Sequence, residues 1–194
     1  NAFFFYCVTA EVAPSGNVYL LGSDITTPSI AKYNAAGVLQ WKISSHGVGY
    51  GTIDGDSSIV KFNTFSFGNV SIDETEANLY FSTYSNASGT PSQIRKLNLS
   101  TLTTTTIAGL ETVFGTTDGP AMSATFKLIT GLALDNQGGL YIADGYNSRI
   151  RYLKNGIVST IIGVAGPGDV DGDIVVAKIQ YPDGLRINNK GDLI

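Results

Sequence analysis

The chain has 194 residues, of which 43% are hydrophobic and only 14% are charged, and this composition excludes a disordered protein. Glycine is abundant, with 23 residues, and long helix-forming runs are missing, which is typical of a β-rich protein with many turns. The net charge is −4 and the longest basic cluster is Arg95-Lys96, so nucleic acid is a disfavoured partner. No apolar run approaches the roughly 20 residues needed to span a bilayer.

The first residues, 1–8, are apolar but short, and they lack an initial Met, a basic leader and a small-residue cleavage site. They therefore predict a buried first strand rather than a signal peptide. Cys7 is the only cysteine, which excludes an internal disulfide and favours a small, buried hydrophobic side chain. Pairing of Cys7 with another chain, or with a part of the protein outside this sequence, is the alternative.

An internal repeat runs through the chain and is clearest in residues 51–62, 115–126 and 168–179. Each stretch contains an Asp-Gly pair, and a large apolar residue follows eight positions after the Asp. The pairs and their apolar residues are Asp54-Gly55 with Phe62, Asp118-Gly119 with Phe126, and Asp171-Gly172 with Ile179. We therefore expect one domain, 1–194, whose repeats cover about 5–62, 63–126 and 127–179, with a truncated repeat at 180–194.

Each repeat contains four short strand candidates, which in the third repeat are 129–134, 140–143, 149–153 and 157–162. Residues 136–139 indicate a turn between the first two, and Asn155-Gly156 is a strong hairpin signal between the last two. Residues 128–134 are apolar throughout, as in a strand buried on both faces, whereas 149–153 alternate like an outer strand with one wet face. Four antiparallel strands per repeat predict an all-β fold, a β-propeller of four-stranded blades.

The third repeat contains, in this order, Asp135, Gly138-Gly139, Leu140–Asp144 and Asn147–Arg151. With this pattern the third repeat resembles an NHL repeat. The resemblance is specific over 115–194 and weaker over 10–114, where Ser82 takes the place of Asp144 in our alignment. It implies a ring of about six blades. We therefore expect the chain to hold three blades and part of a fourth, and the natural protein to be longer.

Three aspartates at alternate positions, Asp169, Asp171 and Asp173, flank Gly172 in the last Asp-Gly stretch. Carboxylates so spaced, with a glycine for the turn, are typical of calcium loops, which need about six to eight oxygen ligands. Only Asp171 and Gly172 recur in every copy, so we favour a structural turn in which the Asp bonds the backbone two residues on. We expect no cofactor, and calcium bound to this loop is the alternative.

Asp144, Arg149 and Arg151 suit either a polar binding face or a structural Asp–Arg pair within or between blades, and we favour the structural pair. Asp135 is expected to cap a turn. His46 is the only histidine, and it lies in a glycine-rich loop without a partner pattern for zinc or for a Ser-His-Asp triad. The enzyme hypothesis is therefore the less favoured one.

N-glycosylation sequons begin at Asn69, Asn86 and Asn98, and this number is no more than chance predicts. Asn86 lies in an extended loop and Asn98 in a hairpin turn, so both are expected to be exposed. Asn69 begins an inner strand and is a poorer glycan acceptor. The threonine run 103–106 aligns with a strand, where threonine is favoured.

Propeller folds host both binding and catalysis. We favour a non-enzymatic scaffold, extracellular or at the cell surface, that binds protein: copies of itself, other domains of a longer chain, or other partners. The first alternative is a propeller enzyme of the lyase or calcium-dependent hydrolase type, with its site completed by blades outside this sequence. The second is an intracellular RNA- or protein-binding NHL module, which the acidic balance opposes.

Overall fold

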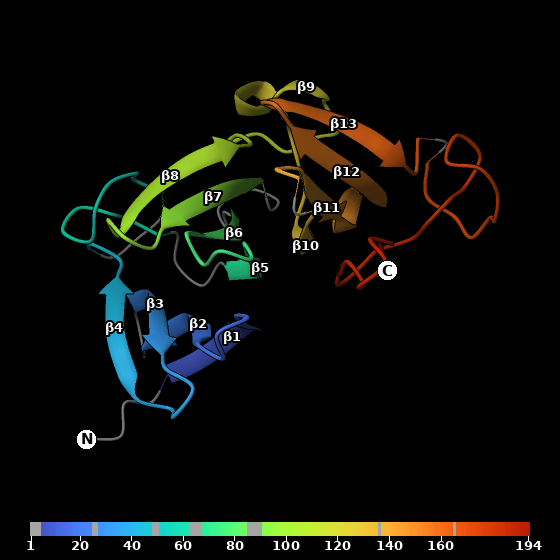
Figure 1. The fold of residues 1–194 in the computed structure, drawn as a ribbon. Coiled ribbons are helices and arrows are strands. Elements are labelled where there is room, and N and C mark those ends of the chain that lie inside the picture. Colours follow the sequence, from blue (N-terminus) through green and yellow to red (C-terminus); the bar gives the residue numbers. More distant parts are fainter. Residues whose placement is uncertain are drawn as a thin grey trace.

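The computed structural model describes residues 5–24, 27–47, 51–62, 67–84, 91–135, 137–164 and 166–194, which form three antiparallel sheets in succession (Figure 1). The first sheet contains β1 (Phe5–Val12), β2 (Val18–Asp24), β3 (Thr27–Tyr33) and β4 (Leu39–Ser44). The second contains β5 (Phe67–Ile72), β6 (Asn78–Tyr84), β7 (Ser92–Asn98) and β8 (Thr103–Ala108). The third contains β10 (Ile129–Leu134), β11 (Leu140–Asp144), β12 (Arg149–Lys154) and β13 (Ile157–Ile162), with β9 (Gly119–Pro120) beside β13.

Each sheet is a meander in which strands that follow one another in sequence are neighbours in space. The innermost strands β1, β5 and β10 contact one another in succession, whereas the outer strands β4, β8 and β13 diverge (Figure 1). This arrangement confirms the predicted β-propeller blades. Two short 3₁₀ turns, Ala121–Ser123 and Gly145–Asn147, are the helical segments of the described chain, and no described helix is long and apolar enough to cross a membrane.

The third blade follows the sequence prediction closely. Its four main strands begin at the predicted residues, and β11 and β12 each extend one residue further than expected. Asn155 and Gly156 both have positive φ, 51° and 74°, which is the backbone of the predicted two-residue hairpin turn. Every residue of β10 is buried or half-buried, as its apolar sequence predicts. Asn136, in the other predicted turn, lies outside the described residues.

Two expectations about exposure are wrong. The strand with Arg151 is not an outer strand: β12 lies between β11 and β13, and Arg151 is fully buried. Of residues 1–8, which were expected to form a buried strand, 1–4 lie outside the described residues, and nothing is described of the side chains of 5 and 6. Cys7 and Val8 belong to β1, which is the edge of its sheet and pairs with β2 alone among the described strands. Val8 and Val12 are 54% and 65% exposed, and Cys7 is an exposed free thiol rather than a core residue.

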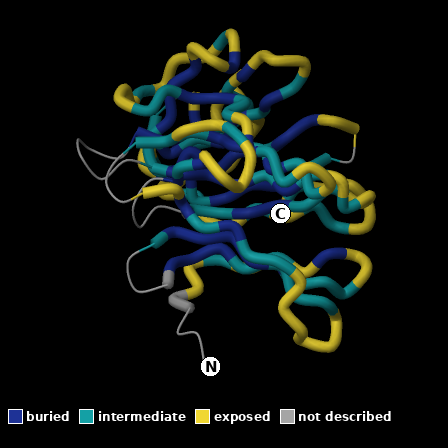
Figure 2. Tube along the Cα trace, turned by 90° about the vertical axis from the view of Figure 1, so that its left-hand side faces the viewer, coloured by how far each residue is buried: buried dark blue, intermediate teal, exposed yellow. Residues whose placement is uncertain are grey.

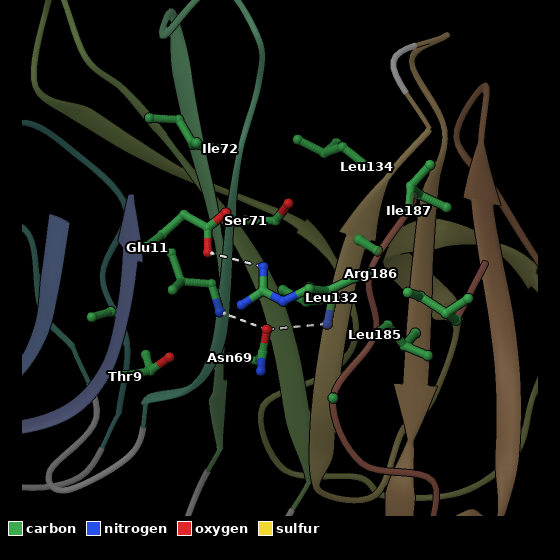
Figure 3. A pocket seen from close by; sticks show the side chains of 15 residues that line it. Thr9, Glu11, Asn69, Ser71, Ile72, Leu132, Leu134, Leu185, Arg186 and Ile187 are labelled. Carbon is green, nitrogen blue, oxygen red and sulfur yellow. Dashed lines mark hydrogen bonds and ion pairs between the residues drawn. The ribbon is translucent and has the colours of Figure 1, made fainter. Parts of the chain in front are cut away.

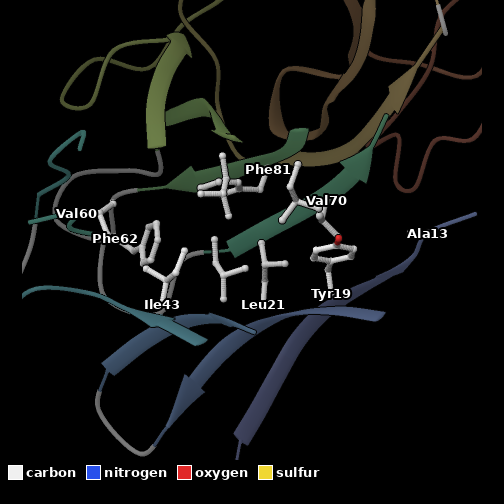
Figure 4. Close-up of a cluster of buried hydrophobic side chains, with 11 residues drawn as sticks. Ala13, Tyr19, Leu21, Ile43, Val60, Phe62, Val70 and Phe81 are labelled. Carbon is white, nitrogen blue, oxygen red and sulfur yellow. The ribbon is translucent and has the colours of Figure 1, made fainter. Parts of the chain in front are cut away.

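The core consists of two hydrophobic layers, one between each pair of successive blades. The first layer contains Leu21 and Ile43 from the first blade and Val70 and Phe81 from the second (Figure 4). Phe62 meets Phe81 edge to face at a centroid distance of 5.8 Å. Most buried residues therefore lie in the sheets, and most exposed residues lie in the loops at the ends of the sheets (Figure 2).

The repeating Asp-Gly stretches supply part of both layers. Val60 and Phe62 follow the first Asp-Gly pair and are 0% and 1% exposed. Ala124 and Phe126 follow the second pair and are both 0% exposed. Each stretch thus leaves one blade and inserts its last residues beneath the next, which explains why a large apolar residue recurs at a constant distance from the Asp.

Candidate functional site

Arg151 lies at the centre of the third blade in a fully satisfied polar site. Its Nε and Nη2 donate to Asp118 Oδ1 at 2.9 and 2.6 Å, and its Nη1 donates to Asp144 Oδ2 at 2.9 Å. The remaining donors reach the carbonyl oxygens of Thr117 at 2.8 Å and Thr125 at 3.2 Å. A guanidinium has five N–H donors, and all five directions are used here. The favoured structural Asp–Arg pair is therefore present in the fold.

Arg95 occupies the same position in the second blade with a poorer set of partners. Its Nη1 donates to Lys61 O at 2.7 Å, and its Nη2 donates to Ile53 O and Asp54 Oδ1, both at 2.8 Å. Its Nε has no partner among the described residues. Burial lowers the pKa of Arg95 below its ordinary value, although the hydrogen bond and charge of Asp54 act in the opposite direction.

The second blade has no counterpart of the carboxylate at Asp144. The strand register pairs Ile142 with Arg151 and Phe81 with Arg95, so Thr83, not Ser82, stands at the position of Asp144. The alignment that placed Ser82 there is wrong by one residue, because Ile72 pairs with Leu79, seven residues further on, whereas Leu134 pairs with Leu140, six residues further on. Thr83 is 2% exposed and its hydroxyl has no partner in the described chain.

The recurring aspartates also bind the outer strand of the next blade. Asp54 Oδ2 accepts from Thr106 N at 2.8 Å, and Asp118 Oδ2 accepts from Thr160 N at 2.9 Å. The following Gly55 has a φ of 150°, which agrees with the predicted turn. The carboxylates themselves bond across the blade rather than to the backbone two residues on. Sequence reasoning missed this role because the partners are 33 to 52 residues away.

Arg149 and Asp135 form hydrogen bonds outside the Arg151 site. Arg149 is half-buried, and its Nη1 reaches Thr160 Oγ1 at 3.4 Å rather than Asp144. Asp135 Oδ1 accepts from Gln137 N and Gly139 N, both at 2.7 Å, which is the expected turn cap. Burial alone would raise the pKa of Asp135, but these bonds and one from the Tyr152 hydroxyl outweigh it and hold the pKa below its ordinary value.

The candidate metal loop is exposed in this structure. Asp169, Asp171 and Asp173 all have exposed side chains. Over the described residues, no group of three or more His, Cys, Asp and Glu side chains converges as a metal site would require. Calcium in this loop stays a prediction. His46 is exposed as well, and its backbone N–H donates to Val60 O at 2.7 Å.

A cavity of about 510 Å³ lies where the innermost strands meet (Figure 3). Its walls are residues 9–11 of β1, 69–72 of β5, 132–134 of β10, and residues 184–187 and 194 of the fourth repeat. The face of a strand contributes every second residue, whereas these strands contribute consecutive residues. The cavity is therefore lined by strand edges, which is the position of the axis in a propeller.

Glu11 and Arg186 face each other across this axial cavity. Glu11 Oε2 lies 3.9 Å from Arg186 Nη1, and the Arg186 side chain is 74% exposed (Figure 3). Burial raises the pKa of Glu11, and the charge of Arg186 partly offsets that rise. Neither residue stood out in the sequence, since neither belongs to the repeating pattern, and only the ring arrangement brings them together.

Asn69 joins the second and third blades at the wall of the cavity. Its Nδ2 donates to Thr130 O at 3.1 Å, and its Oδ1 accepts from Val70 N at 2.9 Å and Leu132 N at 3.2 Å. A glycan on Nδ2 would disrupt the hydrogen bond from Nδ2 to Thr130 O. Asn69 therefore remains a poorer candidate for glycosylation than Asn98. Asn98 lies at the β7–β8 hairpin, where its Oδ1 accepts from Ser100 N at 3.0 Å. Asn86 lies outside the described residues.

Parts of this chain are similar in sequence to known proteins. A family model described as "NHL repeat" matches residues 126–151. The chain is 30% identical over 112 residues to "Protein SUPPRESSOR OF QUENCHING 1, chloroplastic" of Arabidopsis thaliana, a match that covers 53% of this chain and 10% of that protein.

Solved structures with a similar fold have low sequence identity. One is an auxiliary nutrient binding protein from Bacteroides thetaiotaomicron, with a TM-score of 0.68, 17% identity, and coverage of 95% of this chain and 43% of that one. Another is the hydrazine synthase of Kuenenia stuttgartiensis, with a TM-score of 0.59, 9% identity, and coverage of 97% and 57%. This chain thus spans about a tenth of its curated relative and less than half of the Bacteroides protein. Taken together with the blades and the matched segment, these comparisons show that the chain is a β-propeller carrying an NHL repeat at residues 126–151.

Proposed function

We propose that this propeller is a non-enzymatic scaffold that binds a protein segment along its axial cavity. The observation that carries the proposal is the lining of that cavity by the free edges of β1, β5 and β10. An edge strand presents unpaired N–H and C=O groups, which an extended peptide pairs with when it adds to a sheet.

The chemistry of the cavity suits a polypeptide. Its volume of about 510 Å³ accommodates a few side chains, and its walls mix apolar residues such as Leu132 and Leu134 with polar ones such as Ser71. Glu11 and Arg186 place one charge of each sign at the cavity, which favours a segment with complementary charges in a fixed orientation. The backbone groups Val70 N, Leu132 N and Thr130 O are already bonded to the Asn69 side chain, so pairing would occur at the neighbouring positions.

Site-directed photo-cross-linking in the native source tests this proposal. A photoreactive residue at Ala10, which is exposed and lines the cavity, is compared with one at Thr105, which is exposed on the outer strand β8. We expect a discrete protein adduct from position 10 and none from position 105, and we expect Arg186→Gln to weaken it. Equal adducts at both positions would contradict the proposal. A small molecule retained in native mass spectrometry, without a protein adduct, would point instead to nutrient binding like that named for the Bacteroides protein.

The extracellular location is part of the same proposal. It is supported by the sequon at Asn98, whose side chain lies at a hairpin turn away from the cavity. Intact-mass analysis of native material, with Asn98→Gln as the control, measures the glycan directly. Absence of glycan in secreted eukaryotic material would remove this support. The lyase, hydrolase and RNA-binding alternatives stay predictions from the resemblance.

A further inference from the structure

Arg149, which takes no part in the buried Asp–Arg pair, lines a cavity of about 380 Å³ at the turn between β11 and β12, called here the Arg149 cavity. Its Nη1 donates to Thr160 Oγ1 at 3.4 Å, and its other N–H groups have no hydrogen-bond or ion-pair partner among the residues that the structure describes. Neither Asp nor Glu is found among the described residues that line the cavity. A half-buried guanidinium thus faces this cavity without a carboxylate to neutralise it.

The second blade shows that the fold does not require a cation at this position. Gln93 of β7 occupies the register position that Arg149 has in β12. Thr52 Oγ1 donates to Gln93 Oε1 at 2.9 Å, and Thr116 is the counterpart of Thr52 in the repeated Asp-Gly stretches. In the third blade Thr116 and Arg149 line the cavity instead. The positive charge is therefore particular to the blade that has the cavity.

Ser148 supplies a second hydrogen-bond donor to the Arg149 cavity. It is 4% exposed, and its Oγ accepts from Tyr181 N at 3.4 Å, which leaves the hydroxyl proton without an acceptor in the described chain. Asn147 also lines the cavity, but its Nδ2 already donates to Gly115 O at 2.6 Å and to both carboxylate oxygens of Asp144. The donors that remain are a guanidinium and one hydroxyl, which match the acceptor positions of a carboxylate.

Two tyrosines form aromatic walls of the same cavity. The ring centroids of Tyr146 and Tyr181 lie 6.0 Å apart with an angle of 77° between the ring planes, and the two residues are 52% and 62% exposed. Lys127 Nζ lies 6.0 Å from the Tyr146 ring centroid and adds a second positive charge nearby. A ring that enters this corner can lie against the face of one tyrosine and meet the edge of the other.

We propose that the Arg149 cavity binds a small ring compound that bears one carboxylate. The carboxylate accepts from the planar fork of Arg149 and from the Ser148 hydroxyl, and the ring packs against Tyr146 and Tyr181. The ring is aromatic, as in benzoate, or that of a sugar acid, as in galacturonate, and the experiment separates these two sources. This site is distinct from the axial cavity, because no described residue lines both cavities.

The first experiment measures binding of benzoate and galacturonate to the 194-residue protein by isothermal titration calorimetry at constant ionic strength. Benzyl alcohol and galactose are the matched rings without a carboxylate, and acetate is the carboxylate without a ring. We expect one of the two acids to bind saturably, at least about tenfold more tightly than its neutral counterpart and than acetate. The acid that binds identifies the source of the ring. Failure of both acids to bind, or equal binding of the neutral ring or of acetate, would overturn the proposal.

The second experiment repeats the titration with variants. Arg149→Gln places in the third blade the residue that the second blade has at this position, so we expect it to fold and to weaken binding of the acid at least about tenfold. Lys190→Gln is the matched control, because it removes the same charge from an exposed residue outside the cavity. Tyr146→Leu should reduce the affinity for the acid to that for acetate. Equal weakening by Lys190→Gln would mean that net charge, and not this cavity, attracts the acid.

The third measurement follows the unsubstituted protein by ¹H–¹⁵N NMR. The Nε–H resonance of Arg149, assigned by its absence from the spectrum of Arg149→Lys, should shift with the same concentration dependence as the calorimetric titration. The backbone resonances of Ser148 and Tyr181 should shift with it. Shifts confined to Ala10 and Leu132 would overturn the proposal, because these residues line the axial cavity. Arg186→Gln, which is expected to weaken a protein segment in the axial cavity, should leave binding of the acid unchanged, so the two proposals fail separately.

Discussion

The second and third blades each bury an arginine at the equivalent position of the third strand, but with different partners. In the third blade Arg151 meets two carboxylates, of which Asp144 is 0% exposed and Asp118 is 41% exposed. In the second blade Arg95 meets Asp54 alone, which is 44% exposed, and Thr83 replaces the buried carboxylate. The feature that both blades share is thus the carboxylate from the preceding Asp-Gly stretch. The buried carboxylate within the blade is an addition that binds the arginine more completely but creates a second buried charge.

The largest expected effect is that of Arg151→Met. This change leaves the buried carboxyl group of Asp144 without its ion-pair partner, and we expect a loss of about 3–5 kcal/mol in the free energy of unfolding. Urea unfolding followed by tryptophan fluorescence and circular dichroism measures it. Restoration of most of this loss by the further change Asp144→Ser would show that the stranded carboxylate is the cause. No restoration would assign the loss to packing against Phe126 instead.

Arg95→Met is expected to cost less, about 1–3 kcal/mol by the same measurement, since the carboxylate that it leaves is partly exposed and can be hydrated. The substitution also removes the unpartnered buried Nε, which offsets part of the loss. A cost equal to that of Arg151→Met would break the comparison, because it would mean that the buried Asp144 adds nothing to the penalty.

The smallest expected effect concerns Asp135, which has a hydrogen bond from Tyr152 in the third blade, where the second blade has Lys96. Its pKa is lower in the folded protein than in the unfolded chain. Its contribution to stability is therefore fully present above the unfolded pKa of about 3.9 and is lost as the pH falls through the folded pKa.

We expect Asp135→Asn to lower the free energy of unfolding by about 1 kcal/mol at pH 7. The difference from the unsubstituted protein should shrink toward zero as the pH falls below the ordinary Asp range. Unfolding curves at pH 7, 4 and 2.5 check this trend. A difference that grows as the pH falls would contradict the direction of the pKa shift.

Local signals predicted the strands and turns well. The alternation and the apolar runs located β10 to β13, and Asn155-Gly156 located the hairpin, because these features depend on residues that are close in sequence. The same local reasoning failed at Cys7, which is apolar in type but lies on an edge strand. It also misaligned Ser82 with Asp144, because one extra residue in a turn shifts a strand by one position and reverses the face of every side chain.

The sequence by itself determined that this protein is a repeating antiparallel β fold, since the periodicity of its apolar residues and its Asp-Gly pairs is written into the chain. Only the tertiary structure decided what those pairs do. Asp54 and Asp118 find their partners 33 to 52 residues away, on strands that another blade brings into place, so their roles depend on which blades meet. For the same reason Asp171, which belongs to the same Asp-Gly motif, has no arginine partner among the described residues, whereas Asp54 and Asp118 are engaged with arginine.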